Sequence, residues 1–390
     1  MKLLVYECKS YSDYDLCDCL LQMNIDYERF SYNFNLSGDY NNEDEQFVEY
    51  FINNIDTSCY DAVFSIDFWP PLATACYRSN IKYIAYSYDC PFHIERVEDT
   101  LSLPNVYCFM FDRNQLKKYL DMGIDNIYHM PLSVNSKRYR RIDVSDKKYD
   151  KYRTQISFIG KLYDNNRYAL IKGLVNDKTA TVLDNILAMQ QKLPNMRIVE
   201  SLLTDNIVAL IDSEMHTNND AFRDNVTREK LAFAIDSQLT FMERILILNT
   251  CAKKYDVNFY SSSKCELVKG TNNFGEVNYL NEMPYIFQAS DINLNQTLKA
   301  ITSGVTLRVF DIVASGGFLL TNRQEELEKY FTDGVDVGVY DSIYDFEEKL
   351  DFYMSHSELR QKIQLAGRER CLTEHSMVNR ISNILRMAKV

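Results

Sequence analysis

The chain has 390 residues, a length that suits two α/β domains better than one. Hydrophobic residues make up 46% and charged residues 25%, so the chain can bury a sizeable core, and disorder as the dominant state is excluded. The formal net charge is −12, which argues against a general nucleic-acid binder because such a protein needs a basic face for phosphates. A local basic pocket for a small anionic ligand is compatible with this charge.

Targeting and metal-binding signals are weak. The N-terminal run in MKLLVYECKSYSD is too short for a signal peptide, and eighteen uninterrupted apolar residues occur nowhere, so we expect a cytoplasmic protein. The ten cysteines and five histidines show no metal-ligand spacing, so we expect buried reduced thiols and no metal site.

Short apolar runs alternate with helical patterns through the first third of the chain. The predicted strands are Lys2–Glu7, Ala62–Ile66, Lys82–Tyr86, Val106–Phe111 and Ile127–Met130. Helices are predicted at Tyr14–Met23 and Gln115–Met122. This alternation is typical of βαβ units and a parallel sheet.

The segment 136–153 differs in character, with eight basic and three acidic residues and little apolar material. We interpret it as a solvated linker between a domain at 1–135 and a domain at 154–372. Because a basic stretch on an acidic protein can also face anionic lipid, a peripheral contact with the inner face of the membrane is a second interpretation.

A second alternation begins with the strand Gln155–Ile159, which ends at Gly160. A helical insert is predicted at about 175–250, with helices at Val182–Gln191, Ile198–Ser213 and Thr227–Lys253. Further strands are predicted at Val257–Tyr260, Ile292–Asn295 and Phe318–Thr321. The remaining helices are predicted at about Thr306–Ala314, Phe346–Met354, Ser357–Thr373 and Met377–Lys389.

The most informative stretch is a strand that runs into the loop Thr302–Val305 and then into a helix. Gly304 lets the backbone approach a ligand closely, and the free N–H groups of the helix start form an anion site. Thr306 and Arg308 add a hydroxyl and a charge, and Asp311 can accept hydrogen bonds from ribose. The residues alone predict a phosphate-and-ribose site at a strand's carboxyl end. A plain helix with a glycine before and after it is the alternative.

Several segments carry a resemblance to a known family: SFIGKLYDNNR (157–167), RVFDIVASGGFLLTN (308–322), and the stretches 61–91, 111–135 and 331–381. They resemble the spore maturation protein CgeB family, which consists of glycosyltransferase-like proteins related to retaining glycosyltransferase family 4. The resemblance implies the α/β fold class GT-B, in which two Rossmann-like domains face each other across a cleft. The insert would be an elaboration of the second domain, and 373–390 would return to the first.

The resemblance places a nucleotide-sugar donor on the second domain and an acceptor on the first. The residues that it assigns to donor binding are Gly160, Lys161, Arg167, Tyr260, Met283, Pro284, Asn295, Gly304, Val305, Thr306 and Asp311. Asp311 stands where the family has a ribose-binding glutamate. Ser303 stands eight positions earlier, where the family has a sugar-contacting glutamate, and this is a departure from the pattern.

No Asp-x-Asp pair occupies a suitable loop, so we expect catalysis without a metal or other cofactor. Lys264, Lys161 or Arg308, together with the Gly304 loop, would stabilise the leaving diphosphate. On the acceptor side, the catalytic candidates are Asp89 and His93, with Asp67 as a rival. A retaining enzyme needs no protein base, because the leaving phosphate can take the acceptor proton.

The resemblance therefore implies a glycosyltransferase that moves a sugar from a nucleoside diphosphate to a glycan, a lipid-linked glycan or a protein, with retention of configuration. The alternative is a catalytically degenerate scaffold that binds nucleotide or glycan without turnover, which Ser303 favours. A periplasmic-type binding protein fits less well because no signal peptide is recognised. A GT-B sugar-nucleotide epimerase fits less well because its carboxylate-rich site is missing.

Overall fold

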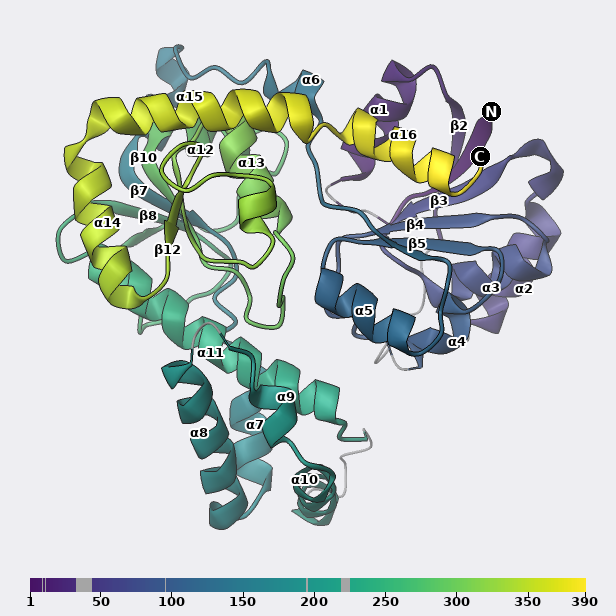
Figure 1. Cartoon of the computed structure of the whole chain (residues 1–390), viewed down its shortest axis with the longest axis horizontal. Helices are drawn as coiled ribbons and strands as arrows, with labels where there is room; N and C mark the ends of the chain where they lie inside the picture. Colours follow the sequence, from purple (N-terminus) through teal and green to yellow (C-terminus); the bar gives the residue numbers. More distant parts are fainter. Residues whose placement is uncertain (9, 11, 33–43, 95, 194–195, 219–224) are drawn as a thin grey trace.

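The computed structural model describes residues 1–8, 10, 12–32, 44–94, 96–193, 196–218 and 225–390. Two six-stranded sheets form two halves of the molecule, and helices cover both faces of each sheet (Figure 1). Every strand pairing within these sheets is parallel. This is the α/β architecture that the sequence predicts.

The first sheet has the order β2-β1-β3-β4-β5-β6. Its strands are β1 Lys2–Tyr6, β2 Asp26–Phe30, β3 Ala62–Ile66, β4 Tyr83–Ser87, β5 Val106–Met110 and β6 Ile127–His129. Its helices are α1 Asp13–Gln22, α2 Glu45–Asn54, α3 Pro70–Arg78, α4 Val97–Leu101 and α5 Arg113–Asp121. The central strands β3 and β4 are buried along their whole length, which explains their continuous apolar sequences.

The second sheet has the order β12-β11-β10-β7-β8-β9. Its strands are β7 Thr154–Ile159, β8 Val257–Tyr260, β9 Asn272–Asn273, β10 Ser290–Asn295, β11 Leu319–Asn322 and β12 Gly338–Tyr340. The helices that pack on it include α12 Met283–Ala289, α13 Leu307–Ser315, α14 Ile343–Ser355 and α15 Ser357–Glu374. Gly316 ends α13 with φ +82°, a left-handed conformation that favours glycine.

The helical insert is an arm that projects from the second half (Figure 1). Its helices are α7 Arg167–Leu174, α8 Asp177–Lys192, α9 Val199–Leu202, α10 Asp205–Asn218 and α11 Arg228–Cys251. The insert has its own apolar cluster, and α11 joins this cluster to the core of the second sheet. The single helix predicted at 198–213 is wrong: Leu203, at ψ 73°, separates α9 from α10.

Two chain segments connect the halves. The first is the stretch after β6, and the second leads from α15 into α16 Met377–Met387, which packs against α1 (Figure 1). They lie side by side, because the Val134 N–H donates to the His375 oxygen (3.1 Å) and the Met377 N–H to the Val134 oxygen (2.8 Å). One apolar cluster is also shared by residues of both halves.

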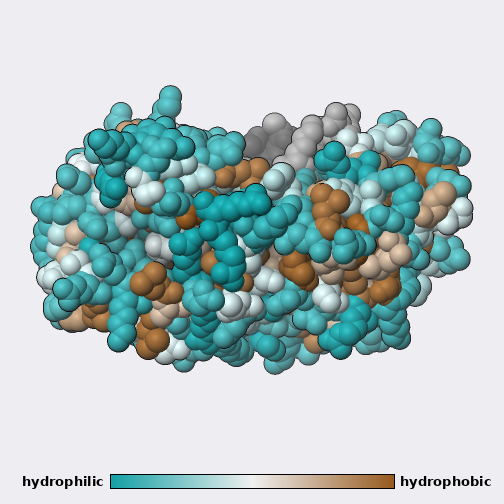
Figure 2. All heavy atoms as spheres, turned by 90° about the horizontal axis from the view of Figure 1, so that it is seen from above, coloured by the Kyte–Doolittle hydropathy of each residue, from teal (hydrophilic) through white to brown (hydrophobic). Residues whose placement is uncertain are grey.

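The predicted linker is not the purely solvated segment that we expected. It contains α6 Ser136–Tyr139 and a 3-10 helix at Lys147–Tyr152, and it buries Tyr139, Ile142 and Tyr152. Five of its eight basic residues pair with carboxylates, among them Lys137 with Asp18 and Arg138 with Asp15. The face seen from above is largely hydrophilic, with hydrophobic side chains in separate groups (Figure 2).

Candidate functional site

The carboxyl ends of the two parallel sheets meet in the middle of the molecule. Phe111 and Asp112, directly after β5, contact the loop 302–304 that follows β10. His129, at the end of β6, contacts Glu326, which follows β11. Ligand sites of parallel α/β sheets lie at this edge, so each half presents its functional edge to the other.

Gly304 is required by the contact between the halves. A Cβ atom at this position would lie 2.6 Å from the Phe111 Cδ2 atom and 3.0 Å from the Asp112 Cα atom. We expected the missing side chain to admit a ligand. In the structure this space is taken by the Phe111 ring and the Asp112 Cα atom of the first half.

The N–H groups of this loop bind a protein carboxylate. The Asp112 Oδ2 atom accepts hydrogen bonds from Thr302 (3.0 Å), Ser303 (2.8 Å) and Gly304 (2.9 Å). Its Oδ1 atom caps α5 by accepting from Gln115 (2.8 Å). The Gly304 N–H that we expected at a diphosphate is therefore already paired.

Glu326 is a fully buried carboxylate with partners in both halves. Its Oε1 atom accepts from the Arg113 N–H (3.0 Å) and the Ser303 hydroxyl (2.9 Å). Its Oε2 atom lies 2.9 Å from His129 Nε2 and accepts from the Tyr330 hydroxyl (3.1 Å). Burial opposes ionisation, but these donors outweigh it and lower the pKa of Glu326 to about 2.

The start of α13 is the best candidate for an anion site. Thr306 precedes the helix, but its side chain makes no capping bond, and its buried Oγ1 atom has no hydrogen-bond partner. Arg308 is partly exposed in the first turn, where its Nη1 atom contacts the Met283 sulfur. The first N–H groups of a helix and a nearby guanidinium both attract a phosphate. Val305, just before Thr306, is buried.

Asp311 is closed off from solvent, with 1% of its surface exposed. Its Oδ1 atom accepts from the hydroxyls of Tyr139 (2.8 Å) and Tyr279 (3.0 Å), and its Oδ2 atom lies 3.8 Å from Arg308 Nη1. Burial raises the pKa of Asp311, and the charge of Arg308 limits that rise. A ribose contact at the Asp311 Oδ1 atom would therefore have to replace a tyrosine hydroxyl, whereas the Oδ2 atom faces Arg308.

Arg138 joins the linker to this group and was missed by the sequence analysis. It binds both carboxylate oxygens of Asp15 (2.8 and 2.6 Å) and lies over the rings of Tyr139 (4.2 Å) and Tyr279 (5.2 Å). Its Nη1 atom is buried without a hydrogen-bond partner. Arg138 lies in the basic stretch that we interpreted as solvated, so the sequence did not indicate that its side chain pairs with Asp15.

Gly160 and Lys161, directly after β7, lie beside Arg244 of α11. Arg244 donates to the backbone oxygens of Lys161 and Gln296, and its Nη1 atom lies 3.8 Å from the position of a Cβ on Gly160. Lys161 and Arg167 are exposed. Asn295 is buried, and its amide donates to the hydroxyls of Thr297 and Thr321. Asn295 therefore links the end of β10 to β11.

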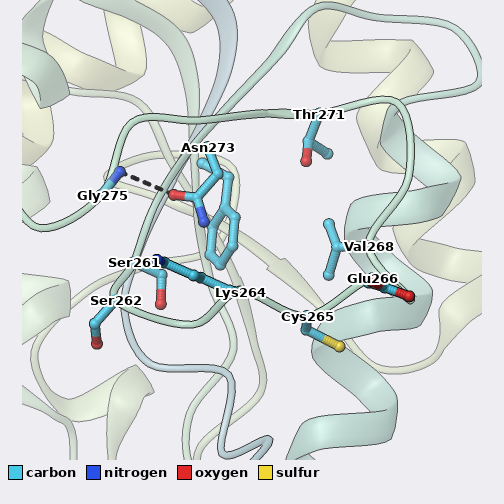
Figure 3. Close-up of a pocket in the computed structure, with 10 residues that line it drawn as sticks. Ser261, Ser262, Lys264, Cys265, Glu266, Val268, Thr271, Asn273 and Gly275 are labelled. Carbon is cyan, nitrogen blue, oxygen red and sulfur yellow. Dashed lines mark hydrogen bonds between the residues drawn. The ribbon is translucent and has the colours of Figure 1, made fainter.

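Lys264 lies on a separate cavity of about 480 Å³ beyond β8 (Figure 3). The loop after β8 returns there through Asn273, whose Oδ1 atom accepts from the Gly275 N–H (2.9 Å). Neither Arg308 nor Asp311 lines this cavity. Tyr260 is buried and stacks on Phe274 (5.4 Å), whereas Met283 and the buried Pro284 begin α12 beside Arg308.

The acceptor-side candidates follow β3 and β4. Asp67 accepts hydrogen bonds from the backbone N–H groups of Tyr88 (2.7 Å) and Asp89 (3.0 Å) through one oxygen. Burial, together with the charge of Asp89, raises the pKa of Asp67 to about 7. Asp89 is exposed, and desolvation by the surrounding protein raises its pKa. His93 is exposed and packs against Phe233 of α11, with ring centroids 4.1 Å apart.

No group of three or more His, Cys, Asp or Glu side chains among the described residues is placed to hold a metal ion. Within the same part of the chain, no helix is both long and apolar enough to cross a membrane.

Comparison with known proteins gives one family match. Residues 244–386 match the family model described as glycosyl transferase-like. No curated protein matches the chain in sequence. Solved structures match it over nearly its whole length, at low identity.

Three of these structures illustrate the match. HepE from Anabaena in complex with UDP is 8% identical, with a TM-score of 0.56 over 100% of this chain and 99% of that chain. Sucrose-phosphate synthase from Thermosynechococcus elongatus is 8% identical, with a TM-score of 0.58 over 99% and 98%. T4 phage BGT in complex with its UDP-glucose substrate is 10% identical, with a TM-score of 0.54 over 100% of both chains.

The chain therefore has the GT-B fold, as the sequence predicts. Its residues 244–386, which contain α13 and Asp311, are glycosyl transferase-like. Both findings agree with the predicted class, a glycosyltransferase.

Proposed function

We propose that this protein transfers a sugar from a UDP-sugar, bound at the start of α13, to an acceptor on the first half. The observation that carries the proposal is the start of α13: a helix N-terminus with the unpartnered Thr306 Oγ1 atom and the Arg308 guanidinium, within the glycosyl transferase-like segment. UDP is the proposed nucleotide because HepE and T4 phage BGT are described with UDP or UDP-glucose.

The chemistry breaks the bond between the sugar C1 atom and the β-phosphate oxygen, and forms a bond from C1 to an acceptor hydroxyl. Negative charge grows on the leaving diphosphate. The α13 N–H groups and Arg308 would stabilise that charge without rearranging. Lys161, exposed after β7, would add a second cation.

The acceptor proton has two routes in this proposal. With retention of configuration, the leaving phosphate oxygen takes the proton, and no protein base is needed. Otherwise, Asp89 takes it, backed by the neighbouring Asp67, because a carboxylate with a raised pKa can accept a proton near neutral pH. His93 contacts the insert as well as the acceptor side and would shape the acceptor site.

The finer parts of the proposal follow the sequence. We propose a retaining, metal-independent enzyme related to the CgeB family, with a glycan, a lipid-linked glycan or a protein as acceptor. Its place would be the cytoplasm. A peripheral membrane contact through residues 136–153 is the weakest part, because most of the basic side chains there are paired.

A second candidate is a degenerate scaffold that binds a nucleotide without turnover. It is favoured by two observations: Asp311 is capped by Tyr139 and Tyr279, and the Gly304 N–H is paired with Asp112. Both groups would otherwise face the donor. Turnover of a nucleotide sugar separates this candidate from the first.

The test is a titration of the purified protein with UDP, GDP, dTDP and CDP and their common sugars, with the unfolding temperature as readout. A ligand that binds only the folded state raises this temperature with its concentration. We expect a shift with UDP compounds that is lost in Arg308→Ala. The matched control is Arg386→Ala, because Arg386 is exposed on α16 and donates to Asn383 of the same helix.

Three outcomes decide the proposal. The donor site is supported if UDP raises the unfolding temperature of the wild type and of Arg386→Ala but not of Arg308→Ala. Release of UDP in the presence of an acceptor then supports transfer. A UDP shift without any release of UDP supports the scaffold. No shift with any nucleotide contradicts the donor site.

A further inference from the structure

Two carboxylates cross between the halves in opposite directions. Asp112, from the first half, binds the loop 302–304, and Glu326, from the second half, binds the start of α5. We propose that this exchange is a clamp, made of Asp112, Ser303 and Glu326, that fixes the α13 loop against the first half. Asp112 and Glu326 are then positioning residues, since each is buried and both of its carboxylate oxygens already have partners within the protein.

The Asp112 side of the clamp concentrates three donors on one atom. Three consecutive backbone N–H groups, from Thr302 to Gly304, point to Oδ2, and the side chain is 1% exposed. Charged acceptors of this kind form stronger hydrogen bonds than neutral ones. Separating the halves would leave these donors and the carboxylate to be solvated again.

On the Glu326 side of the clamp, the carboxylate comes from the second half and the donors from the first half. The Glu326 carboxylate accepts from the first N–H of α5, at Arg113, and from the Arg113 Nε atom (3.1 Å), and it lies against His129. A carboxylate at a helix start is favoured by the helix dipole. Each half thus provides the anion that the other half binds.

Ser303 stands at the centre of the clamp and is fully buried. Its N–H donates to Asp112, its carbonyl accepts from the Glu326 N–H (3.0 Å), and its hydroxyl donates to the Glu326 carboxylate. The same hydroxyl accepts from the Asn114 N–H (3.2 Å). Its polar groups are all paired, with two of these bonds to the first half and two to Glu326 of its own half, which is a reason for serine at a position where the resembling family has a glutamate.

The clamp has a consequence for the donor, and this consequence rests on the proposed function. Because the N–H groups of 302–304 are occupied, the diphosphate is confined to the start of α13, beginning at Thr306. The clamp holds that helix start at a fixed distance from the acceptor edge. It therefore affects turnover rather than nucleotide affinity.

Asp112→Asn tests the clamp. Each oxygen of Asp112 accepts from a backbone N–H, so an amide NH₂ meets an N–H donor whichever way it is turned. The matched control is Asp44→Asn, because the Asp44 Oδ1 atom caps α2 by accepting from the Phe47 N–H (3.0 Å), and asparagine caps equally well.

Gly304→Ala is a second variant that keeps every charge. The added methyl would lie 2.6 Å from the Phe111 ring and 3.0 Å from the Asp112 Cα atom, so the contact between the halves must shift. Its control is Gly173→Ala on α7, where an added methyl meets nothing within 4 Å. If Asp112→Asn does not fold, Gly304→Ala decides the question.

The readouts are the radius of gyration by small-angle X-ray scattering, the UDP dissociation constant, and kcat. We expect a larger radius of gyration, a UDP affinity unchanged within about threefold, and a kcat about 100-fold lower, because displaced groups no longer meet in reactive geometry. Both controls should match the wild type in all three.

The outcomes separate the clamp from the proposed function. A folded clamp variant with an unchanged radius of gyration overturns the clamp, whatever its activity. A larger radius with an unchanged kcat overturns the positioning role. If the wild type itself transfers no sugar, the proposed function fails, and the scattering result alone then supports or overturns the clamp.

Discussion

The clamp and the start of α13 are neighbours, since Ser303 of the clamp precedes Thr306 by three positions, but they differ in how their polar atoms are used. In the clamp, both oxygens of Asp112 and both oxygens of Glu326 have donors. Around α13, the Thr306 Oγ1 atom and the Arg138 Nη1 atom are buried without partners. Buried polar atoms are nearly always paired, so unpaired ones call for a reason. The difference fits the two proposals, in which the first region joins the halves and the second receives the donor.

The largest effect is expected from breaking the clamp with Glu326→Gln. The amide keeps the shape but removes the charge that faces Arg113 and His129, so the free energy of unfolding should fall by about 3 kcal/mol. Denaturant titration measures this fall. Glu214→Gln is the control, because Glu214 bonds to Asn176 and Thr179 within the insert alone.

Glu326→Gln should also change how the free energy of unfolding depends on pH. The pKa of Glu326 is lowered from 4.5 to about 2, so its stabilisation is complete above about pH 4.5 and is lost as the pH falls towards 2. Glu326→Gln should lack this loss. An equal acid sensitivity in both proteins would contradict the role assigned to Glu326.

A smaller effect is expected from opening the ligand region with Tyr279→Phe. The change removes one of the two hydroxyls on Asp311, which should cost about 1 kcal/mol of stability. If ribose replaces those hydroxyls, UDP should bind several-fold more tightly because less must be displaced. Calorimetric titration with UDP checks this. Unchanged affinity would show that Asp311 does not meet the ribose.

Asp67→Asn extends the comparison to the acceptor edge. The pKa of Asp67 is raised from 3.8 to about 7, so its ionisation opposes folding increasingly as the pH rises through that range. Asparagine cannot ionise, tolerates the φ of 60° at this position, and can still accept from Tyr88 and Asp89. The unfolding midpoint should rise by about 2 °C at pH 8 and stay unchanged near pH 4. A loss of stability at pH 8 would contradict this account.

The smallest effect is expected from Lys264→Ala. Lys264 lines a cavity that neither Arg308 nor Asp311 shares, so UDP affinity should change by less than about twofold. The expectation contrasts with Arg308→Ala in the same titration. A tenfold loss of affinity would restore Lys264 to the donor site, where the sequence analysis placed it.

Much of the fold could be predicted because buried strands have continuous apolar sequences. Strand β3 matches its prediction at both ends, and β4, β5 and β7 match within one residue. The edge strand β2 was not predicted, because its sequence DYERF is mostly polar and only partly buried. The helix α3 was missed because it begins with two prolines.

The candidate site was predictable only where its residues are close in sequence. Thr306, Arg308 and Asp311 share one helix or its start, and their spacing pointed to an anion site. The partners that decide what those residues do lie far away: Tyr139 is 172 positions from Asp311, and Asp112 is 191 positions from Ser303. No local pattern connects such pairs, so the clamp and the capped Asp311 required the structure.

The paired crossing of the chain between the halves, at Val134 and Ser376, restricts how the protein can move. A single connecting segment would let the halves rotate freely about it. Two segments joined by hydrogen bonds restrict this motion to bending about one axis. The clamp lies between the facing edges of the two halves. Cutting the chain before α16 would leave one connecting segment and remove this restriction. A shortened protein would therefore lose the alignment of its two edges even with every clamp residue present.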